Sequence, residues 1–510
     1  MYDSSRNFQE SAAGLRQLVK TGLLSHTDLR DQPERFFKAH RLLARHAVKH
    51  GPGFWIRFTV HYNLCFGTVL AVGSPDQVES MHTAQAEGLL GCFALTEKLA
   101  GVQSGLIVQT RAEYDAASQT FVLNNLGKTE GAYKNWISQG FVADKAVVLA
   151  DLTVGGERKG PHAFLMDMRR DGQLVDGVST GDMGIKTVGN DLDNAWIAFD
   201  NVRLPRTALL SRYATVSEGG VYEQTTANIK PFEMIGQRLY TGRVAVAQAA
   251  LSYRRTLFDD TRAYTDAKAI PAFGKAAASL STIPQLRSLF AEAEETATRL
   301  EEYVAECEAQ LVPLLRDGGV PSEELSHMIA TAKVKAVEHS IDLCWRLKQE
   351  VGSYALMGDS GFGSMDFLQC ACTQAASSTH PPSLTRACAP AARPRPCAAF
   401  LVDRPRVPTP PSLHCGTGCK FAEGDSRVLM LKMARDRLRR YAKDAQAGAP
   451  PRAGEEEETA LCAALAKELG AAKGDKAAEA EIWDREWRSV YDLAEAVMAR
   501  TMEGVLGRRI

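Results

Sequence analysis

The sequence predicts a multidomain α+β protein in which an N-terminal α-helical domain, a middle antiparallel β domain and a C-terminal α-helical bundle follow one another. Apolar residues recur at helical spacing near both ends of the chain, and short apolar runs between glycine-rich turns fill the part between them. The 510 residues suffice for about three domains. Helices and strands that are segregated along the chain favour separate helical and β domains over a wound α/β fold.

Residues 1–90 are expected to form the N-terminal helical domain. The stretch 28–50 repeats apolar positions at helical spacing, and Ser74-Pro75-Asp76 is typical of a helix cap followed by a first turn. Residues 91–212 are expected to form the middle β domain. The apolar runs that predict its strands are TFVLNN (120–125), KAVVLADL (145–152), HAFLMDM (162–168) and NAWIAFD (194–200).

Residues 213–370 contain long amphipathic segments that are expected to pack into a helical bundle, and residues 420–510 are expected to complete it. Between these parts lies an insert, residues 371–419, which holds nine of the 21 prolines and a single acidic residue, Asp403. Such a segment cannot form a helix or a core strand, so we expect it to be disordered.

Six of the 11 cysteines lie in or beside this insert, which raises the question of a metal site. Cys415 and Cys419 have a C-x3-C spacing, but the upstream pair, Cys370 and Cys372, is C-x-C and the residues between the pairs are unpatterned. We therefore expect no metal. The composition of the insert also resembles translated GC-rich non-coding sequence, so it is either a retained intron or a real surface loop.

The overall composition is that of a globular protein, with 45% hydrophobic and 24% charged residues. A net charge of −1 does not favour binding to nucleic acid or to an anionic membrane surface. No apolar run approaches the roughly 18 residues of a membrane span. The N-terminus lacks the apolar core of a signal peptide, and the final Gly-Arg-Arg-Ile is not a peroxisomal signal, so the sequence itself indicates no compartment.

Five segments of the sequence are distinctive: GCFALTEKLAGVQSGL (91–106), NWISQGFVADKAVVLADL (135–152), MGIKTVGNDLDNAWIAFDNVRLPR (183–206), LYTGRVAVAQAAL (239–251) and FAEGDSRVLM (421–430). They resemble segments of acyl-CoA oxidases and acyl-CoA dehydrogenases, the oxidases more closely, and they occur in the order of that family. The resemblance extends over about residues 35–440 and implies the acyl-CoA dehydrogenase-like arrangement of a β domain between helical domains.

The resemblance implies an FAD-dependent acyl-CoA oxidase. Such an enzyme converts a fatty acyl-CoA to the trans-enoyl-CoA and passes the electrons to O2, giving H2O2, in the first step of fatty acid β-oxidation. Glu423 falls where the family has its catalytic base, a role that suits a carboxylate whose proton affinity is raised by burial. On spacing alone, Glu423 can also be a residue at a helix start, with Asp425 and Ser426 as caps.

The resemblance also implies contacts to the cofactor and the substrate. It assigns FAD contacts to Thr96, Gly101, Trp136, Ser138, Gln349 and Gly352, and substrate contacts to Ser104, Arg243 and Gly424. Taken singly, Trp136 can be a core tryptophan, Thr96 a strand or capping residue, and Arg243 a surface arginine at a helix start. Gly352-Ser353-Tyr354 departs from the family's usual Gly-Gly-x-Gly at the Gln349 and Gly352 contact. Lys268 stands near a position where the family often has an arginine for the cofactor's pyrophosphate, and a lysine supplies the charge but not a bidentate fork.

Other functions stay open at this stage. The alternatives are an acyl-CoA dehydrogenase that passes electrons to a partner flavoprotein, a non-catalytic relative that acts as a scaffold, and a chain that misfolds. By family resemblance we expect a homodimer in the peroxisome, with the mitochondrion as the alternative compartment. Only 87 residues follow Glu423, which indicates that the end of the oxidase helical domain is missing.

Overall fold

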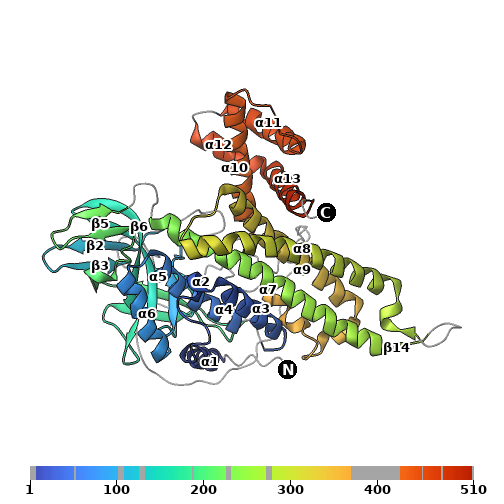
Figure 1. The fold of residues 1–510 in the computed structure, drawn as a ribbon, viewed down its shortest axis with the longest axis horizontal. Helices are drawn as coiled ribbons and strands as arrows, with labels where there is room; N and C mark the ends of the chain where they lie inside the picture. Colours follow the sequence, from blue (N-terminus) through green and yellow to red (C-terminus); the bar gives the residue numbers. More distant parts are fainter. Residues whose placement is uncertain are drawn as a thin grey trace, which may run out of the picture.

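Helices precede and follow a block of strands in the computed structural model, which confirms the predicted fold class (Figure 1). The structure describes residues 7–50, 53–100, 108–125, 133–186, 189–225, 231–271, 278–368, 426–450, 452–472 and 475–507, with the backbone alone at 48–50, 231–238 and 366–367. None of the helices in these ranges is long and apolar enough to cross a membrane.

The N-terminal part is helical, as its apolar spacing predicts. Its elements are α1 Phe8–Lys20, α2 Asp28–Asp31, α3 Pro33–His50, α4 Gly53–Thr59, the π-helix η1 Val60–Phe66, α5 Gly67–Val72 and α6 Pro75–Glu87. The Ser74 side chain accepts a hydrogen bond from the backbone N–H of Gln77, and the Gln77 Oε1 accepts one from the backbone N–H of Ser74, so the predicted cap is a complete capping box. The π-helix lies against the first strand of the β domain.

The middle part consists of strands and short turns. The strands are β1 Gly91–Ala94, β2 Arg111–Asp115, β3 Thr120–Asn124, β4 Lys134–Ser138, β5 Lys145–Val154, β6 Glu157–Asp167, β7 Arg169–Arg170, β8 Gln173–Leu174, β9 Val178–Asp182, β10 Asn194–Phe199, β11 Val202–Pro205, β12 Ala214–Val216 and β13 Tyr222–Gln224. A 3-10 turn, η2 Arg206–Ala208, lies between β11 and β12. Two sheets position the site described below: β1-β5-β2-β3-β11 with β6 beside β5, and β4-β10-β9.

The β domain is not purely antiparallel, which corrects the sequence-based expectation. β5 pairs in parallel with both β1 and β2, and antiparallel with β6 along its length. The central strand therefore has neighbours on both edges and is buried from Ala146 to Ala150. Such a strand has an uninterrupted apolar run instead of an alternating one, and the run does not reveal which segments pair with it.

Three long helices, α7 Pro231–Ala267, α8 Pro284–Asp317 and α9 Glu323–Glu350, pack side by side and extend away from the strands (Figure 1). Short elements join and follow them: β14 Ala269–Ile270, β15 Ala278–Ser279, η3 Leu280–Thr282, η4 Gly352–Leu356 and η5 Phe362–Phe367. The α3 helix packs on α7, so the N-terminal helices and the long helices share one hydrophobic core with the sheets.

The C-terminal helices form a separate cluster that projects from the long helices (Figure 1). They are α10 Ser426–Gln446, α11 Glu456–Ala471, α12 Lys476–Arg485 and α13 Trp487–Leu506. Apolar residues of α10, α11 and α13 pack on Ala330 and Val334 of α9. Buried Arg437 pairs with Glu458 at 2.5 Å and with Glu455 at 3.2 Å, which ties α10 to the start of α11.

Candidate functional site

The loop after β1 and the strand β4 bring together three of the residues that the sequence assigns to the cofactor. The backbone N–H of Asn135 donates to the carbonyl of Thr96 at 2.9 Å, and the N–H of Lys98 donates to the carbonyl of Tyr133 at 3.1 Å. Trp136 and Ser138 follow on β4, and both are partly exposed, like Thr96. We call Thr96, Asn135, Trp136 and Ser138 the β4 cradle.

A fully buried ion pair holds the two segments of the β4 cradle in register. Lys134 Nζ lies 2.9 Å from Glu97 Oε1, and both side chains have no exposed surface. The ammonium also donates to the carbonyls of Leu95 at 3.2 Å and Leu149 at 2.7 Å. Burial lowers the pKa of Lys134 to about 8, while the carboxylate of Glu97 beside it favours the charged form.

The carboxylate of Glu97 is satisfied as completely as its partner. It accepts hydrogen bonds from the N–H of Gln109 at 2.6 Å, the N–H of Thr110 at 2.9 Å and the Thr110 hydroxyl at 2.8 Å. A buried charge is tolerated when its lone pairs are taken in this way. Glu97 follows Thr96 and Lys134 lies two residues before Trp136, so the pair fixes the backbone on both sides of the β4 cradle.

Trp136 lies at an irregularity in the ladder between β4 and β10. The register pairs Ala195 with Ile137 and Ile197 with Lys134, so Asn135 and Trp136 both stand opposite Trp196. Trp136 has a φ of 57°, a left-handed conformation that is rare for a bulky residue. Bulges redirect side chains, and strained backbone persists mainly at functional sites. The bulge therefore supports a ligand-binding function for this strand.

Ser138 is held from the neighbouring strand. Asn194 is its partner across the ladder, and the Asn194 Nδ2 donates to the Ser138 Oγ at 3.1 Å. Asn194 is almost fully buried, so its side chain cannot turn to solvent. The orientation of the Ser138 hydroxyl thus depends on the position of β10.

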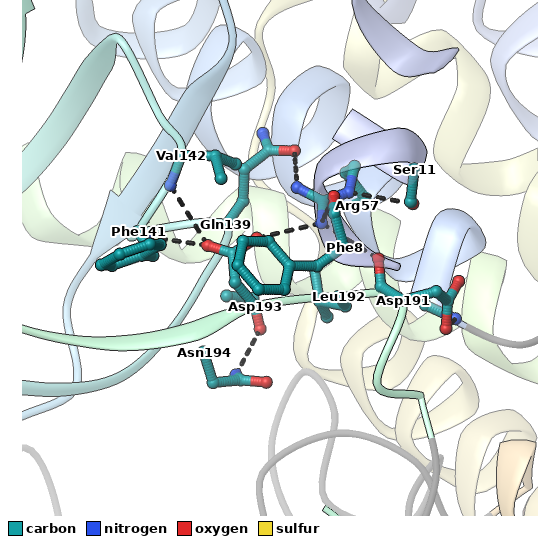
Figure 2. A network of polar contacts seen from close by, with 12 residues as sticks. Phe8, Ser11, Arg57, Gln139, Phe141, Val142, Asp191, Leu192, Asp193 and Asn194 are labelled. Atoms are coloured by element: carbon teal, nitrogen blue, oxygen red, sulfur yellow. Dashed lines mark hydrogen bonds and ion pairs between the residues drawn. The ribbon is translucent and has the colours of Figure 1, made fainter. Parts of the chain in front are cut away.

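A second buried ion pair connects β10 to the N-terminal helices (Figure 2). Arg57 NH2 of α4 lies 2.9 Å from Asp193 Oδ1, and neither side chain is exposed. The guanidinium also donates to Gln139 Oε1 and to the carbonyls of Phe8 and Asp191, at distances of 3.1–3.2 Å. Burial lowers the pKa of Arg57, and the Asp193 carboxylate opposes that shift.

Asp193 also fixes the turn that follows β4. Its Oδ2 accepts hydrogen bonds from the N–H groups of Phe141 at 2.8 Å and Val142 at 3.3 Å. Gln139, next to Ser138, donates through Nε2 to the carbonyl of Gly91 at 2.7 Å. The network of Arg57, Gln139 and Asp193, drawn in Figure 2, therefore connects α4 to the ends of β4 and β10, and Gln139 extends it to β1.

Neither ion pair is among the residues singled out from the sequence. Glu97 and Asp193 lie inside segments that carry the family resemblance, but their partners lie 37 and 136 residues away. One signal in the sequence is Arg57, a charged residue in the apolar run FWIRFTV. That signal does not identify a partner.

The structure places the other predicted FAD residues in a different region. Gln349 lies in the last turn of α9, and Gly352 follows with a φ of 58°; both are exposed. The ring of Tyr354 stacks on Tyr264 of α7 at 3.7 Å between centroids. The segment after α9 lies toward the end of the long helices that is remote from the strands, so one chain does not bring it to the β4 cradle (Figure 1).

Arg243 does not open a helix, which corrects the sequence-based expectation. It lies well inside α7 (Pro231–Ala267), because no proline or glycine pair between Pro231 and Arg243 ends the helix. The guanidinium carbon lies 5.2 Å from the ring centre of Tyr240, one turn earlier. Its assignment to the substrate remains a prediction.

Four predicted site residues lie outside the described residues: Glu423, Gly101, Ser104 and Gly424. The insert 371–419 lies there too. Within the described ranges, His, Cys, Asp and Glu form no group of three or more that could hold a metal ion.

The β4 cradle has an unfilled hydrogen-bonding capacity that fits a flavin. The Oδ1 of Asn135 is buried and has no hydrogen-bond partner among the described residues. A buried acceptor without a donor is costly, and a bound ring with an N–H group would remove that cost. The partly exposed Trp136 offers a flat surface next to it.

Comparison with known proteins was made on sequence and on structure. No protein-family model matches the chain. It is 30% identical over 366 residues to acyl-coenzyme A oxidase 2 of Yarrowia lipolytica, a match that covers 66% of the chain and 50% of that relative. It is 34% identical over 174 residues to peroxisomal acyl-coenzyme A oxidase 1 of Mus musculus, covering 33% of the chain and 26% of that relative. The chain thus spans half, or less, of the length of these relatives.

The fold is similar to that of solved acyl-CoA oxidases. The structure of acyl-CoA oxidase-2 of Caenorhabditis elegans, bound with FAD, ascaroside-CoA and ATP, matches 99% of this chain and 72% of that one with a TM-score of 0.73. The sequence identity in this match is 17%, so it establishes the shared fold alone.

Proposed function

Because the chain belongs to the acyl-CoA oxidase family, we propose that it binds FAD and oxidises the α–β carbon bond of a fatty acyl-CoA. The observation that carries this proposal is the sequence match over 366 residues, which covers 66% of the chain. The strained bulge at Trp136 supports it from an independent direction, because this strand is where the resemblance assigns the flavin.

Four residues of the β domain are proposed to hold the cofactor. Thr96 and Asn135 would bond the polar edge of the flavin, Trp136 would lie against its ring, and Ser138 would bond it from β4. When bound, FAD would supply the acceptor for the hydride that leaves the β carbon. The two buried ion pairs, Glu97–Lys134 and Arg57–Asp193, would keep these residues in place during turnover.

Glu423 is proposed as the base that removes the proton from the α carbon. The removal of an α proton and a β hydride leaves a carbon–carbon double bond, so an acyl-CoA and O2 become a trans-enoyl-CoA and H2O2. A Glu423 carboxylate that is shielded from water would have the raised proton affinity this step needs. Gln349 and Gly352 would contact FAD of a second subunit, which makes a homodimer the proposed assembly, and the peroxisome is the proposed compartment because relatives are peroxisomal.

The test is the absorption spectrum of purified chain reconstituted with FAD. We expect a bound flavin whose absorbance is bleached when a straight-chain acyl-CoA is added without air. Admission of air should restore the spectrum and produce H2O2. A bleached flavin that reoxidises only with an electron-transferring protein would make the chain a dehydrogenase, and a folded chain that binds no flavin would contradict the proposal.

The role of Glu423 is tested separately by Glu423→Gln. The variant should keep bound flavin and bind acyl-CoA but lose flavin reduction by several orders of magnitude, because an amide cannot accept the α proton. The matched control is Glu338→Gln on α9, a residue that the resemblance gives no role. Near-normal reduction by Glu423→Gln would assign the base to another residue.

A further inference from the structure

A pocket of 380 Å³ lies between α7 and α8, and no residue of the β4 cradle lines it. Arg254, Phe258 and Arg262 of α7 face it at helical spacing, and α8 contributes Phe290 and Glu294. Arg255 and Asp259 complete its charged lining. Arg262 and Asp259 are exposed, so the pocket opens at the surface and is deepest at Arg254.

Arg254 is buried with both of its terminal donors unused. Its side chain is 1% exposed, and neither terminal nitrogen, NH1 or NH2, has a hydrogen-bond partner among the described residues. Burial lowers the pKa of Arg254, but a guanidinium stays charged in proteins. A buried cation with two unused donors destabilises the folded state unless an anion binds to it.

The nearest carboxylates are already bound to the next residue along α7. Arg255 Nε and NH2 donate to the two oxygens of Glu301 at 2.6 and 2.8 Å. Arg255 NH1 donates to both oxygens of Glu294 at 3.1 Å. The hydrogen bonds of both glutamates therefore go to Arg255, and they act on Arg254 only through longer-range attraction.

Arg262 provides a second cation at the mouth of the same pocket. Its guanidinium carbon lies 4.3 Å from the ring centre of Phe290, so the side chain is held flat against the pocket wall. It forms no ion pair with any acid in the described part of the chain. Two arginines with unused donors thus face one cavity, one deep and one at the entrance.

We propose that this pocket binds a phosphate group, with Arg254 as the inner ligand and Arg262 as the outer one. Arg254 has two unused terminal donors and Arg262 forms no ion pair in the described part of the chain, and the planar guanidinium fork matches phosphate oxygens in pairs. The cavity is larger than phosphate itself, so it accepts either the free ion or a phosphate monoester. Asp259 lines the entrance and opposes an anion, so it is expected to limit the affinity.

The test is thermal unfolding of the full chain in sodium phosphate against sodium chloride of the same ionic strength. Phosphate should raise the unfolding temperature in a saturable way. AMP, tested in parallel on the chain saturated with FAD so that the cofactor site is filled, separates the two sources of the group: a stronger effect than phosphate assigns a monoester, and a weaker one assigns the free ion. If acetate stabilises as well as phosphate, or if phosphate has no effect, the proposal is wrong.

Variants locate the effect in the pocket. Arg254→Met should weaken phosphate binding by about tenfold or more, since it removes the inner charged donor. It should also unfold at a higher temperature than the parent in chloride alone, because it removes an unpaired buried charge. Arg299→Met, on an exposed position of α8 outside the pocket, is the matched control and should respond to phosphate like the parent.

Two further variants keep the proposal testable if Arg254→Met does not fold. Arg254→Lys keeps the charge without the fork, so it should bind phosphate more weakly than the parent. Asp259→Asn removes the opposing carboxylate at the entrance and should bind phosphate severalfold more tightly. An Asp259→Asn variant with unchanged or weaker affinity, or an Arg254→Met variant that is less stable in chloride and keeps its phosphate response, contradicts the proposed site.

Discussion

Buried arginine is used in two opposite ways in the β domain and in the long helices. Arg57, between α4 and the strands, faces Asp193 and four further acceptors within 3.2 Å. Arg254, between α7 and α8, is equally buried, but its terminal nitrogens have no partner among the described residues. The donors of Arg57 find acceptors within the chain, whereas the terminal donors of Arg254 are left for a ligand.

The difference shows what each region does with a buried charge. A fully paired charge specifies the position of the segments that contribute its partners, even where its net contribution to stability is small. Arg57–Asp193 and Glu97–Lys134 both do this around the β4 cradle. A buried charge without hydrogen-bond partners does not fix the position of other segments, and a ligand that bonds to it gains binding free energy.

Removal of Asp193 should have the largest effect on stability. Asp193→Ala leaves Arg57 buried without its counter-charge and two backbone N–H groups without an acceptor, so we expect a loss of about 4 kcal/mol in the free energy of unfolding. Urea unfolding measures it. Asp200→Asn, an exposed residue beyond β10, is the control and should change stability by less than about 0.5 kcal/mol. An Asp193→Ala variant as stable as this control would mean that the pair does not hold α4 to the strands.

Lys134→Met should cost somewhat less, about 3 kcal/mol, because the Glu97 carboxylate left behind keeps its hydrogen bonds from Gln109 and Thr110. The double variant Glu97→Gln/Lys134→Met should recover part of the loss, since neither charge is then left alone. Urea unfolding of Glu97→Gln, Lys134→Met and the double variant, compared with the parent, completes the double-mutant cycle. If the two single losses simply add in the double variant, the pair is not coupled and does not lock the β4 cradle.

Acid should weaken the N-terminal helices through His40, a buried group that is neutral. Its Nδ1 donates to the carbonyl of Phe36 at 2.8 Å, and its Nε2 accepts from the Thr59 hydroxyl at 2.9 Å. Burial lowers the pKa of His40 from 6.5 to about 4. Between these values the unfolded chain binds a proton that the folded chain does not, so stability is present above pH 6.5 and is lost as the pH falls toward 4.

The expected contribution of His40 is a loss of roughly 2 kcal/mol between about pH 7 and pH 5. The variant His40→Gln should lack this part of the pH dependence, although it is less stable at neutral pH. His46→Gln, at an exposed position four residues from the end of α3, should keep the pH dependence of the parent. Equal slopes for the parent and His40→Gln in urea unfolding at the two pH values would show that the ring does not titrate in this window.

The fold class was predictable because it depends on local periodicity. The helical spacing of 28–50, the cap at Ser74 and the apolar run of 145–152 each correspond to an element of the structure. The parallel pairing of β5 with β1 and β2 was not predictable, since pairing depends on segments far apart in the chain. The ion pairs Glu97–Lys134 and Arg57–Asp193 were not predictable for the same reason, because their partners are far apart in the chain.

The candidate site was predictable only where a resemblance named its residues. Thr96, Trp136 and Ser138 were assigned from quoted segments, and the structure brings them together on one strand and its neighbouring loop. The helix around Arg243 begins earlier than its sequence block, because the preceding residues contain no signal that prevents helix formation. The backbone strain at Trp136 leaves no trace in the sequence, since tryptophan is otherwise a favourable strand residue.

Trp136 should show the smallest change in stability and the clearest separation of stability from binding. Trp136→Gly relieves the left-handed conformation, which costs a bulky residue about 1–2 kcal/mol, and it loses the packing of a partly exposed ring, a cost of similar size. The two terms oppose each other, so the free energy of unfolding without cofactor should change by less than about 1 kcal/mol. The affinity for FAD, measured by fluorescence quenching, should nevertheless fall at least tenfold if the ring packs on the flavin.

Ile137→Val, at the buried neighbour that faces the opposite side of β4, is the control and should lose about 1 kcal/mol of stability while it keeps FAD affinity. If Trp136→Gly instead loses stability like a core residue and binds FAD normally, the tryptophan belongs to the core of the β domain and the bulge has no part in the site.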